Sequence, residues 1–282
     1  MPTPTPSRRS PSATVHEPSA AQPGLTRDQH GEHGEHDEHV DSLPPATWPR
    51  TLGHLAARLV PGWIAIWAII VGIGLLVTGP MTGHWPLTVE DDVNRGLQDA
   101  RTPFWDTVTY LLGWMGATAI VVGSAIVAAI VLRVRLKRWA ESVFVLAAPL
   151  GQSVVFFFTQ LLIERDRPDV ERLDDSPPTS SFPSGHSSAA MSLWWGLALT
   201  CHRVMRPGWR RDAVVVLFAV LPLGVMAARL YRGMHHPSDV AASLVNASLI
   251  LLLTDRVVRG TRFPEVGGTS RDDAERAPER AA

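Results

Sequence analysis

Apolar residues are concentrated in the middle of the chain and are sparse near its two ends. Three long apolar runs contain no Lys, Arg, Asp or Glu, at 59–77, 107–132 and 142–163. Each run is long enough for a membrane-spanning helix, which needs about 20 apolar residues. The spacing therefore predicts at least three helices that cross a bilayer.

Three shorter apolar runs follow, at 187–200, 213–228 and 240–254. Each has roughly 15 residues, which is at or below the length that spans a bilayer. A run of this length on its own is typical of a buried helix in a soluble protein, but the long runs nearby favour membrane helices. We therefore predict an all-α, polytopic membrane protein with a bundle of about six transmembrane helices within residues 53–258.

The two ends of the chain have a different composition. Residues 1–52 are rich in Pro, Ser, Thr, His and acidic residues, and residues 259–282 are similarly polar. Segments of this kind bury too little apolar surface to offset the loss of chain entropy on folding. We expect both to be disordered tails, so the mean hydropathy of +0.07 averages two unlike populations.

Charge and cysteine content exclude several classes of protein. The 282 residues carry 26 basic and 27 acidic side chains, for a formal net charge of -1. This balance gives no reason to expect a nucleic-acid partner. The single cysteine, Cys201, excludes an intramolecular disulfide and a cysteine-based zinc site.

The distribution of basic residues predicts the orientation of the helices. Alternating topology places both tails and the connections at 133–138 and 202–212 on one side, together with 19 of the 26 basic residues. Such a bias marks the cytoplasmic side. We therefore expect a plasma-membrane protein with both termini in the cytoplasm. The outer side keeps seven arginines: Arg95, Arg101, Arg165, Arg167, Arg172, Arg229 and Arg232.

Three outer-side stretches carry candidate chemistry. They run from Gln160 to Pro168, from Ser181 to Ser188 and from Arg229 to Asp239. Arginine offers planar paired donors that suit a phosphate group. A helix that begins after Ser184 adds free backbone N–H groups and a favourable dipole for an anion.

The histidines of these stretches suggest a reaction on the bound anion. His186 and His235 would supply one nucleophile and one general acid. Pro237 suits the first position of a helix, which places Asp239 in its first turn near His235. A carboxylate beside an imidazole fixes its tautomer and stabilises its cationic form. We read His236 as a neighbour that caps this helix, and Arg232 as solvated or facing lipid headgroups.

The three stretches together resemble the signature of the type 2 phosphatidic acid phosphatase / vanadium haloperoxidase superfamily, in its membrane-integral lipid phosphatase branch. That signature reads K-x6-R-P, P-S-G-H and S-R-x5-H-x3-D. The chain has Gln160-x6-Arg167-Pro168, then Pro183-Ser184-Gly185-His186, then Ala228-Arg229-x5-His235-x3-Asp239. Order and internal spacing match throughout, and the resemblance covers most of the chain outside its tails.

The resemblance implies a role for each matching residue. His235 would attack phosphorus and form a phosphohistidine, Asp239 would orient His235, and His186 would protonate the leaving oxygen. The expected phosphate-binding residues are Arg167, Arg229, Ser184, Gly185, Gln160 and Arg165. The resemblance implies no metal and no cofactor, because arginines and helix N-termini supply the positive potential.

Two positions depart from the family pattern. Gln160 stands where the family has lysine, and Ala228 stands where it has serine. Glutamine still donates a hydrogen bond but brings no charge. We expect hydrolysis of a lipid phosphate or pyrophosphate, of the phosphatidic acid, phosphatidylglycerophosphate or undecaprenyl diphosphate class. The alternatives are phosphoryl transfer to an alcohol acceptor and a catalytically weakened lipid-phosphate binder or transporter.

Two further features concern metal ions. His30, His33, His36 and His39 recur every three residues in the N-terminal tail, a pattern that suggests weak divalent-metal binding, although a plain solvated tail is favoured. Acidic residues also gather in 166–175, where we expect a solvated loop and not a cation site.

Overall fold

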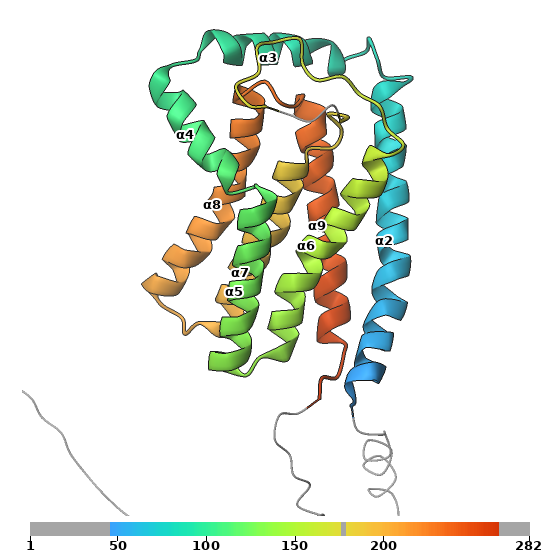
Figure 1. Cartoon of the computed structure of the whole chain (residues 1–282), viewed down its shortest axis with the longest axis vertical. Coiled ribbons are helices and arrows are strands. Elements are labelled where there is room, and N and C mark those ends of the chain that lie inside the picture. The colour runs from blue at the N-terminus through green and yellow to red at the C-terminus, as the bar shows by residue number, and fades with distance from the viewer. Residues whose placement is uncertain (1–45, 176–178, 265–282) are drawn as a thin grey trace, which may run out of the picture. The chain divides into compact units, whose positions relative to one another are not determined.

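The computed structural model describes residues 46–175 and 179–264, which contain helices and no strand. The predicted all-α class is confirmed. The helices in Figure 1 are α2 (Trp48–Thr78), α3 (Glu90–Asp99), α4 (Pro103–Trp114), α5 (Thr118–Leu136), α6 (Trp139–Gln160), α7 (Gly185–Val204), α8 (Trp209–Tyr231) and α9 (Pro237–Arg259), with a short 3-10 turn at Leu87–Val89.

The helices α2, α5, α6, α7, α8 and α9 form the bundle, which is roughly consistent with the predicted number of about six transmembrane helices. By length and composition, five described helices are apolar enough to cross a membrane: α2, α5, α6, α8 and α9. The sixth, α7, is more polar and packs against α5, α6, α8 and α9. Ser187, Ser188 and Ser192 of α7 are buried. A helix enclosed by other helices contacts little lipid, so it tolerates hydroxyl groups that find partners inside the protein.

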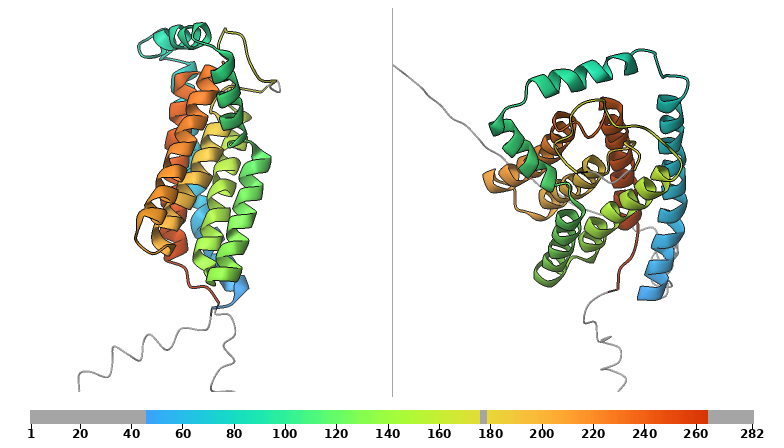
Figure 2. Two further views of the ribbon diagram at one scale, coloured as in Figure 1. Left: turned by 90° about the vertical axis from the view of Figure 1, so that its left-hand side faces the viewer. Right: turned by 45° about the horizontal axis from the view of Figure 1, so that its top comes forward.

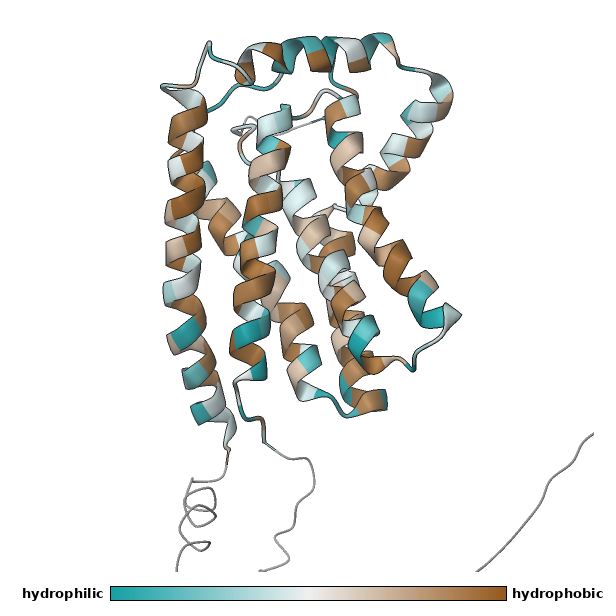
Figure 3. Ribbon diagram, turned by 180° about the vertical axis from the view of Figure 1, so that it is seen from behind, coloured by the Kyte–Doolittle hydropathy of each residue, from teal (hydrophilic) through white to brown (hydrophobic). Residues whose placement is uncertain are grey.

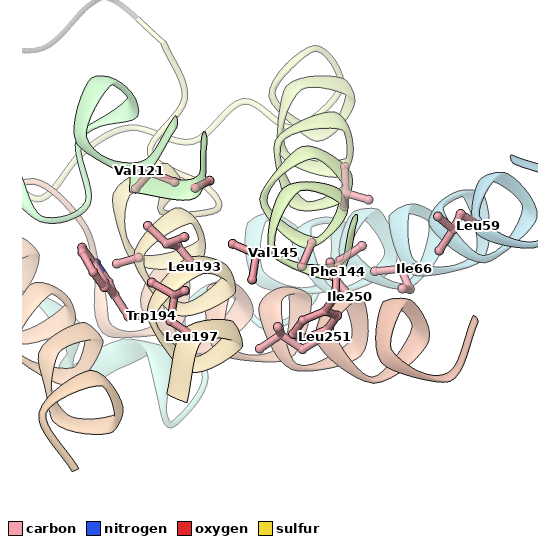
Figure 4. Packing of buried hydrophobic residues seen from close by; sticks show 14 of the residues in the cluster. Leu59, Ile66, Val121, Phe144, Val145, Leu193, Trp194, Leu197, Ile250 and Leu251 are labelled. Carbon is pink, nitrogen blue, oxygen red and sulfur yellow. The ribbon is translucent and has the colours of Figure 1, made fainter. Parts of the chain in front are cut away.

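Buried side chains of several helices, among them α6, α7 and α9, fill the interior of the bundle, as Figure 4 shows. Apolar side chains from these helices form one buried cluster with residues of α2 and α5, among them Ile66, Val121, Phe144, Val145, Leu193, Leu197, Ile250 and Leu251. Large apolar side chains on the outward faces of α2, α5 and α8 remain exposed instead, and Figure 3 shows apolar residues covering the shafts of the helices. An outward apolar surface of this kind suits the hydrocarbon of a bilayer.

The N-terminal boundary differs from the expected one. Helix α2 begins at Trp48, ahead of the expected start at residue 53, so residues 48–52 belong to the helix and not to the tail. Trp48 makes an edge-to-face contact with Trp139 at a centroid distance of 4.4 Å. The Thr51 hydroxyl donates a hydrogen bond to the Arg262 carbonyl. The remaining expectations for the tails, including the His30–His39 tract, lie outside the described residues.

The second long apolar run forms two helices where one was expected. Residues Met115–Ala117 separate α4 from α5. The indole N–H of Trp194 donates to the Met115 carbonyl at 2.9 Å, so α7 satisfies a carbonyl at the end of α4. Gly116 lies against the backbone of α7, where a β-carbon would come within 2.7 Å of the His186 carbonyl oxygen. Close contact with α7 therefore fixes the break.

Helix α3 lies across one end of the bundle, the upper end in Figures 1 and 2. It belongs to the 79–104 segment, which connects α2 to α4. Trp85 and Phe104 of this segment are strongly exposed. Glu90 at the start of α3 is buried instead, with 6% of its surface exposed. The segment thus covers the upper end and places one acidic side chain inside it.

Candidate active site

The three motif stretches meet at the upper end of the bundle. The first follows the end of α6, the second opens α7, and the third forms the turn between α8 and α9. A cavity of about 230 Å³ lies between them. Six of the nine predicted site residues line it: Gln160, Arg167, Gly185, His186, Arg229 and His235. Ser184, Arg165 and Asp239 do not.

His235 is held with one ring nitrogen committed to the backbone. Its side chain is buried, and Nδ1 lies 2.8 Å from the Ser181 carbonyl oxygen. A carbonyl oxygen only accepts hydrogen bonds, so Nδ1 carries the proton in this contact. The neutral imidazole then has its lone pair on Nε2, on the other side of the ring. Nε2 is therefore the ring nitrogen whose lone pair this contact leaves available.

The surroundings of His235 favour its neutral form. Burial lowers the pKa of His235, and the positive charges of Arg229 and Arg167 act in the same direction. Asp239 opposes them by favouring the imidazolium. A lowered pKa keeps the imidazole neutral, and so nucleophilic, to a lower pH than in an exposed histidine.

Asp239 lies farther from His235 than the expected orienting contact requires. Its Oδ2 is 3.8 Å from Nδ1, which is beyond hydrogen-bond distance, and the Ser181 carbonyl takes that place. Asp239 is fully buried, and Oδ2 accepts the backbone N–H of His236 at 2.8 Å. It thus completes a capping box in which His236 is the N-cap of α9, the role expected for His236.

Ser184 serves the start of α7 and not the cavity. It is the N-cap of α7 and is fully buried. Its N–H donates to the Asp239 carbonyl at 3.3 Å, so that N–H is not free for an anion. The free N–H groups at this helix end are those of the next residues, Gly185 and His186, which have no carbonyl four residues back inside the helix.

Arg229 points to the cavity but holds a carboxylate. Its Nη1 donates to Oδ2 of Asp174 at 2.8 Å. Oδ1 of the same carboxylate accepts two hydrogen bonds from Arg232, which is buried and not solvated as expected. Burial by itself would raise the pKa of Asp174, but the two arginines outweigh it and hold the pKa below its ordinary value. Asp174 is therefore an anionic partner of Arg229 at the edge of the cavity.

Two more cavity residues are fixed by backbone carbonyls. Arg167 donates from Nη1 to the Met234 carbonyl at 2.7 Å, next to His235 in the chain. The Gln160 amide donates to the Phe182 carbonyl at 2.9 Å. Gln160 thus ties the end of α6 to the loop before α7, and its amide nitrogen is already used.

Arg165 lies beside the cavity, in contact with two carboxylates. Its Nη2 donates to Glu90 at 2.6 Å, and its Nη1 contacts Asp239 and the Ser238 hydroxyl. The expected phosphate contact is not what this geometry shows, because both guanidinium Nη atoms hold other partners. Glu90 was missed by sequence reasoning, since nothing in 79–104 marks one acidic residue among several.

The acidic loop shows no arrangement for a cation. Within 46–175 and 179–264, no group of three or more His, Cys, Asp or Glu side chains is placed to hold a metal ion. Asp174 of this loop is engaged by arginines, as described above. The positive charges at the cavity come from arginine side chains.

Comparison with known proteins agrees with this arrangement. Residues 140–262 match the PAP2 superfamily, over a range that includes all three motifs and helices α6 to α9. These residues form a PAP2 domain. No curated protein sequence matches the chain.

Two solved structures resemble the chain over a longer range than the family match. The first transmembrane PAP2 type phosphatidylglycerolphosphate phosphatase from Bacillus subtilis superposes with a TM-score of 0.57 at 18% identity, covering 70% of this chain and 94% of that one. LpxE from Aquifex aeolicus gives a TM-score of 0.43 at 20% identity, covering 60% and 93%. The first likeness is one of fold and covers most of the helical bundle, which agrees with a multi-pass membrane protein.

Proposed function

We propose that the chain is a membrane-integral phosphatase that hydrolyses a lipid phosphate or pyrophosphate through a phosphohistidine. The observation that carries the proposal is one cavity lined by two histidines and two arginines, with Nε2 of His235 left as the free ring nitrogen. A cavity of about 230 Å³ accommodates a phosphate group and leaves the apolar part of a lipid outside. The family match supports phosphatase chemistry.

The reaction follows in two balanced steps. The Nε2 lone pair of His235 attacks phosphorus, the phosphorus–oxygen bond to the lipid breaks, and His186 gives a proton to the leaving oxygen. Water then attacks the phosphohistidine, His186 takes a proton from it, and the nitrogen–phosphorus bond breaks with the electron pair returning to Nε2. Arg167, Arg229 and the N-terminus of α7 stabilise the negative oxygens during both steps.

In this mechanism Asp239 acts on His235 through its negative charge and not through a hydrogen bond. It is a fully buried carboxylate 3.8 Å from Nδ1 of His235. Transfer of the phosphoryl group makes the imidazole cationic, and a nearby buried negative charge stabilises that cation. The Ser181 carbonyl fixes the ring, and Asp239 compensates its charge.

The test is phosphate release by the purified protein from phosphatidic acid, phosphatidylglycerophosphate and undecaprenyl diphosphate in micelles. His235→Ala should abolish release, whereas His202→Ala, at the other end of α7, should retain it. Release should persist in EDTA, and an alkali-stable phosphorylated protein should form with native protein alone. Equal release from the native and His235→Ala proteins would refute the mechanism.

Two observations favour a second candidate, a lipid-phosphate binder or transporter. Gln160 brings no charge to the cavity, and Asp174 already occupies Arg229. Both features weaken the positive potential that a phosphoryl transfer needs. Binding of a lipid phosphate by native protein without release of phosphate would favour this candidate.

Product analysis with added glycerol separates hydrolysis from transfer to an alcohol.

A further inference from the structure

A chain of alternating charges leads away from His235 across the upper end of the bundle. Asp239 lies beside His235, Arg165 contacts Asp239, and Glu90 contacts Arg165 from the start of α3. The two carboxylates are almost completely buried and the guanidinium is largely buried. We call these three residues the Glu90–Arg165–Asp239 chain.

Glu90 uses both oxygens of its carboxylate in this chain. Oε2 accepts Nη2 of Arg165 at 2.6 Å, and Oε1 accepts the backbone N–H of Ser238 at 2.6 Å. Ser238 lies in the first turn of α9, next to Asp239, and its hydroxyl also contacts Arg165. One acidic side chain of α3 therefore holds both the guanidinium and the helix turn that carries Asp239.

Arg165 acts on His235 along a second route, through its backbone. The Arg165 carbonyl accepts the N–H of Ser181 at 2.9 Å. The Ser181 carbonyl in turn accepts Nδ1–H of His235. Arg165 thus supports both the Ser181 residue whose carbonyl orients the imidazole and the Asp239 carboxylate that compensates the charge of the imidazole.

The charge balance of the chain explains why Glu90 is needed. Arg165 paired with Asp239 alone would neutralise the carboxylate, and the pair would offer little to a cationic His235. With Glu90 included, two carboxylates face one guanidinium, and a net charge of -1 remains beside the imidazole. That charge matches the +1 that His235 acquires when it is phosphorylated.

We infer that Glu90 and Arg165 are positioning residues that set the charge felt by His235 in opposite directions. The inference rests on the proposed function. It removes Arg165 from the phosphate-binding set and gives α3 a role in catalysis. Charged and titratable groups also face His235 from other elements, namely His186 of α7, Arg229 of α8 and Arg167 of the loop after α6.

Substitutions of the two residues have predicted effects of opposite sign. Glu90→Gln keeps an oxygen acceptor but removes a negative charge, so His235 should protonate at lower pH. Arg165→Gln removes a positive charge, so His235 should protonate at higher pH. Each shift should be roughly one pH unit, and the double variant, with its net charge of -1 restored, should return close to the native midpoint.

Two readouts measure these midpoints independently. The first is the acid limb of kcat/KM for phosphate release, which in the native protein should lie below the ordinary histidine pKa of about 6.5. The second is the pH dependence of His235 modification by diethyl pyrocarbonate, which needs only the neutral imidazole and is followed by mass spectrometry. In Glu90→Gln, kcat should fall about tenfold with KM nearly unchanged.

The matched control is Asp92→Asn. Asp92 lies on the same helix but forms an exposed pair with Arg95, so its loss should move neither midpoint. Opposite shifts in the modification midpoints without any phosphate release would support the charge chain and refute the proposed phosphatase. Phosphate release with equal midpoints in all variants would overturn the inference and leave the phosphatase standing. A lower Tm alone, without opposite shifts, would indicate a structural role and also overturn it.

Discussion

A methyl group added at Gly116 should disturb the active site from the break between α4 and α5. The β-carbon of Gly116→Ala would lie 2.7 Å from the His186 carbonyl oxygen and 2.9 Å from Cγ1 of Val225. The first neighbour is backbone, so no rotamer change relieves the overlap. Opening the gap from 2.7 Å to an ordinary 3.4 Å requires a shift of about 0.7 Å in the first turn of α7.

This shift gives the expected magnitudes. Overpacking of this kind costs about 1–3 kcal/mol of stability. The displaced turn carries His186 and Gly185, and a misplacement of about 1 Å at a catalytic group lowers the rate by up to about a hundredfold. We therefore expect kcat for phosphate release to fall at least about tenfold in Gly116→Ala, with a lower Tm.

Gly123→Ala is the matched control for this change. Gly123 lies in α5, and its added methyl group would meet no atom within 4 Å. Alanine favours a helix over glycine by up to about 1 kcal/mol, so this variant should keep its kcat and match or exceed the native Tm. The assay is phosphate release with thermal unfolding in the same detergent. Equal kcat and Tm in the two variants would refute the proposed close contact.

Two further predictions concern the loop between α6 and α7. Asp174→Asn removes the anion held by Arg229, so the inhibition constant of inorganic phosphate should become several-fold lower. The control Asp169→Asn, at an exposed position of the same loop, should leave this constant unchanged. Weaker inhibition by phosphate in Asp174→Asn would contradict competition between Asp174 and phosphate for Arg229. Asp169→Cys in a Cys201→Ala background should react with an impermeant maleimide in intact cells; labelling only after permeabilisation would place the site in the cytoplasm.

Much of the fold is readable from the sequence, because a bilayer imposes a simple rule on it. Helices that contact lipid must present long apolar faces, so α2, α6, α8 and α9 were visible as charge-free runs. Hydropathy no longer predicts the structure where a helix contacts other helices in place of lipid. It did not reveal the break at Met115–Ala117, which depends on Trp194 and the start of α7.

The candidate site divides in the same way. The motifs predicted which residues line the cavity. Each motif is a short stretch at a helix end, and the predicted topology places all three ends on the same side of the membrane. Contacts between distant segments were decided only by tertiary structure. The Ser181 carbonyl that orients His235 is a backbone group with no side-chain signature, and Glu90 reaches Arg165 across 75 residues of sequence. The sequence by itself determined which functional side chains lie at the upper end of the bundle. Tertiary packing determined which atoms contact and orient them, because those contacts join segments that are far apart in the chain.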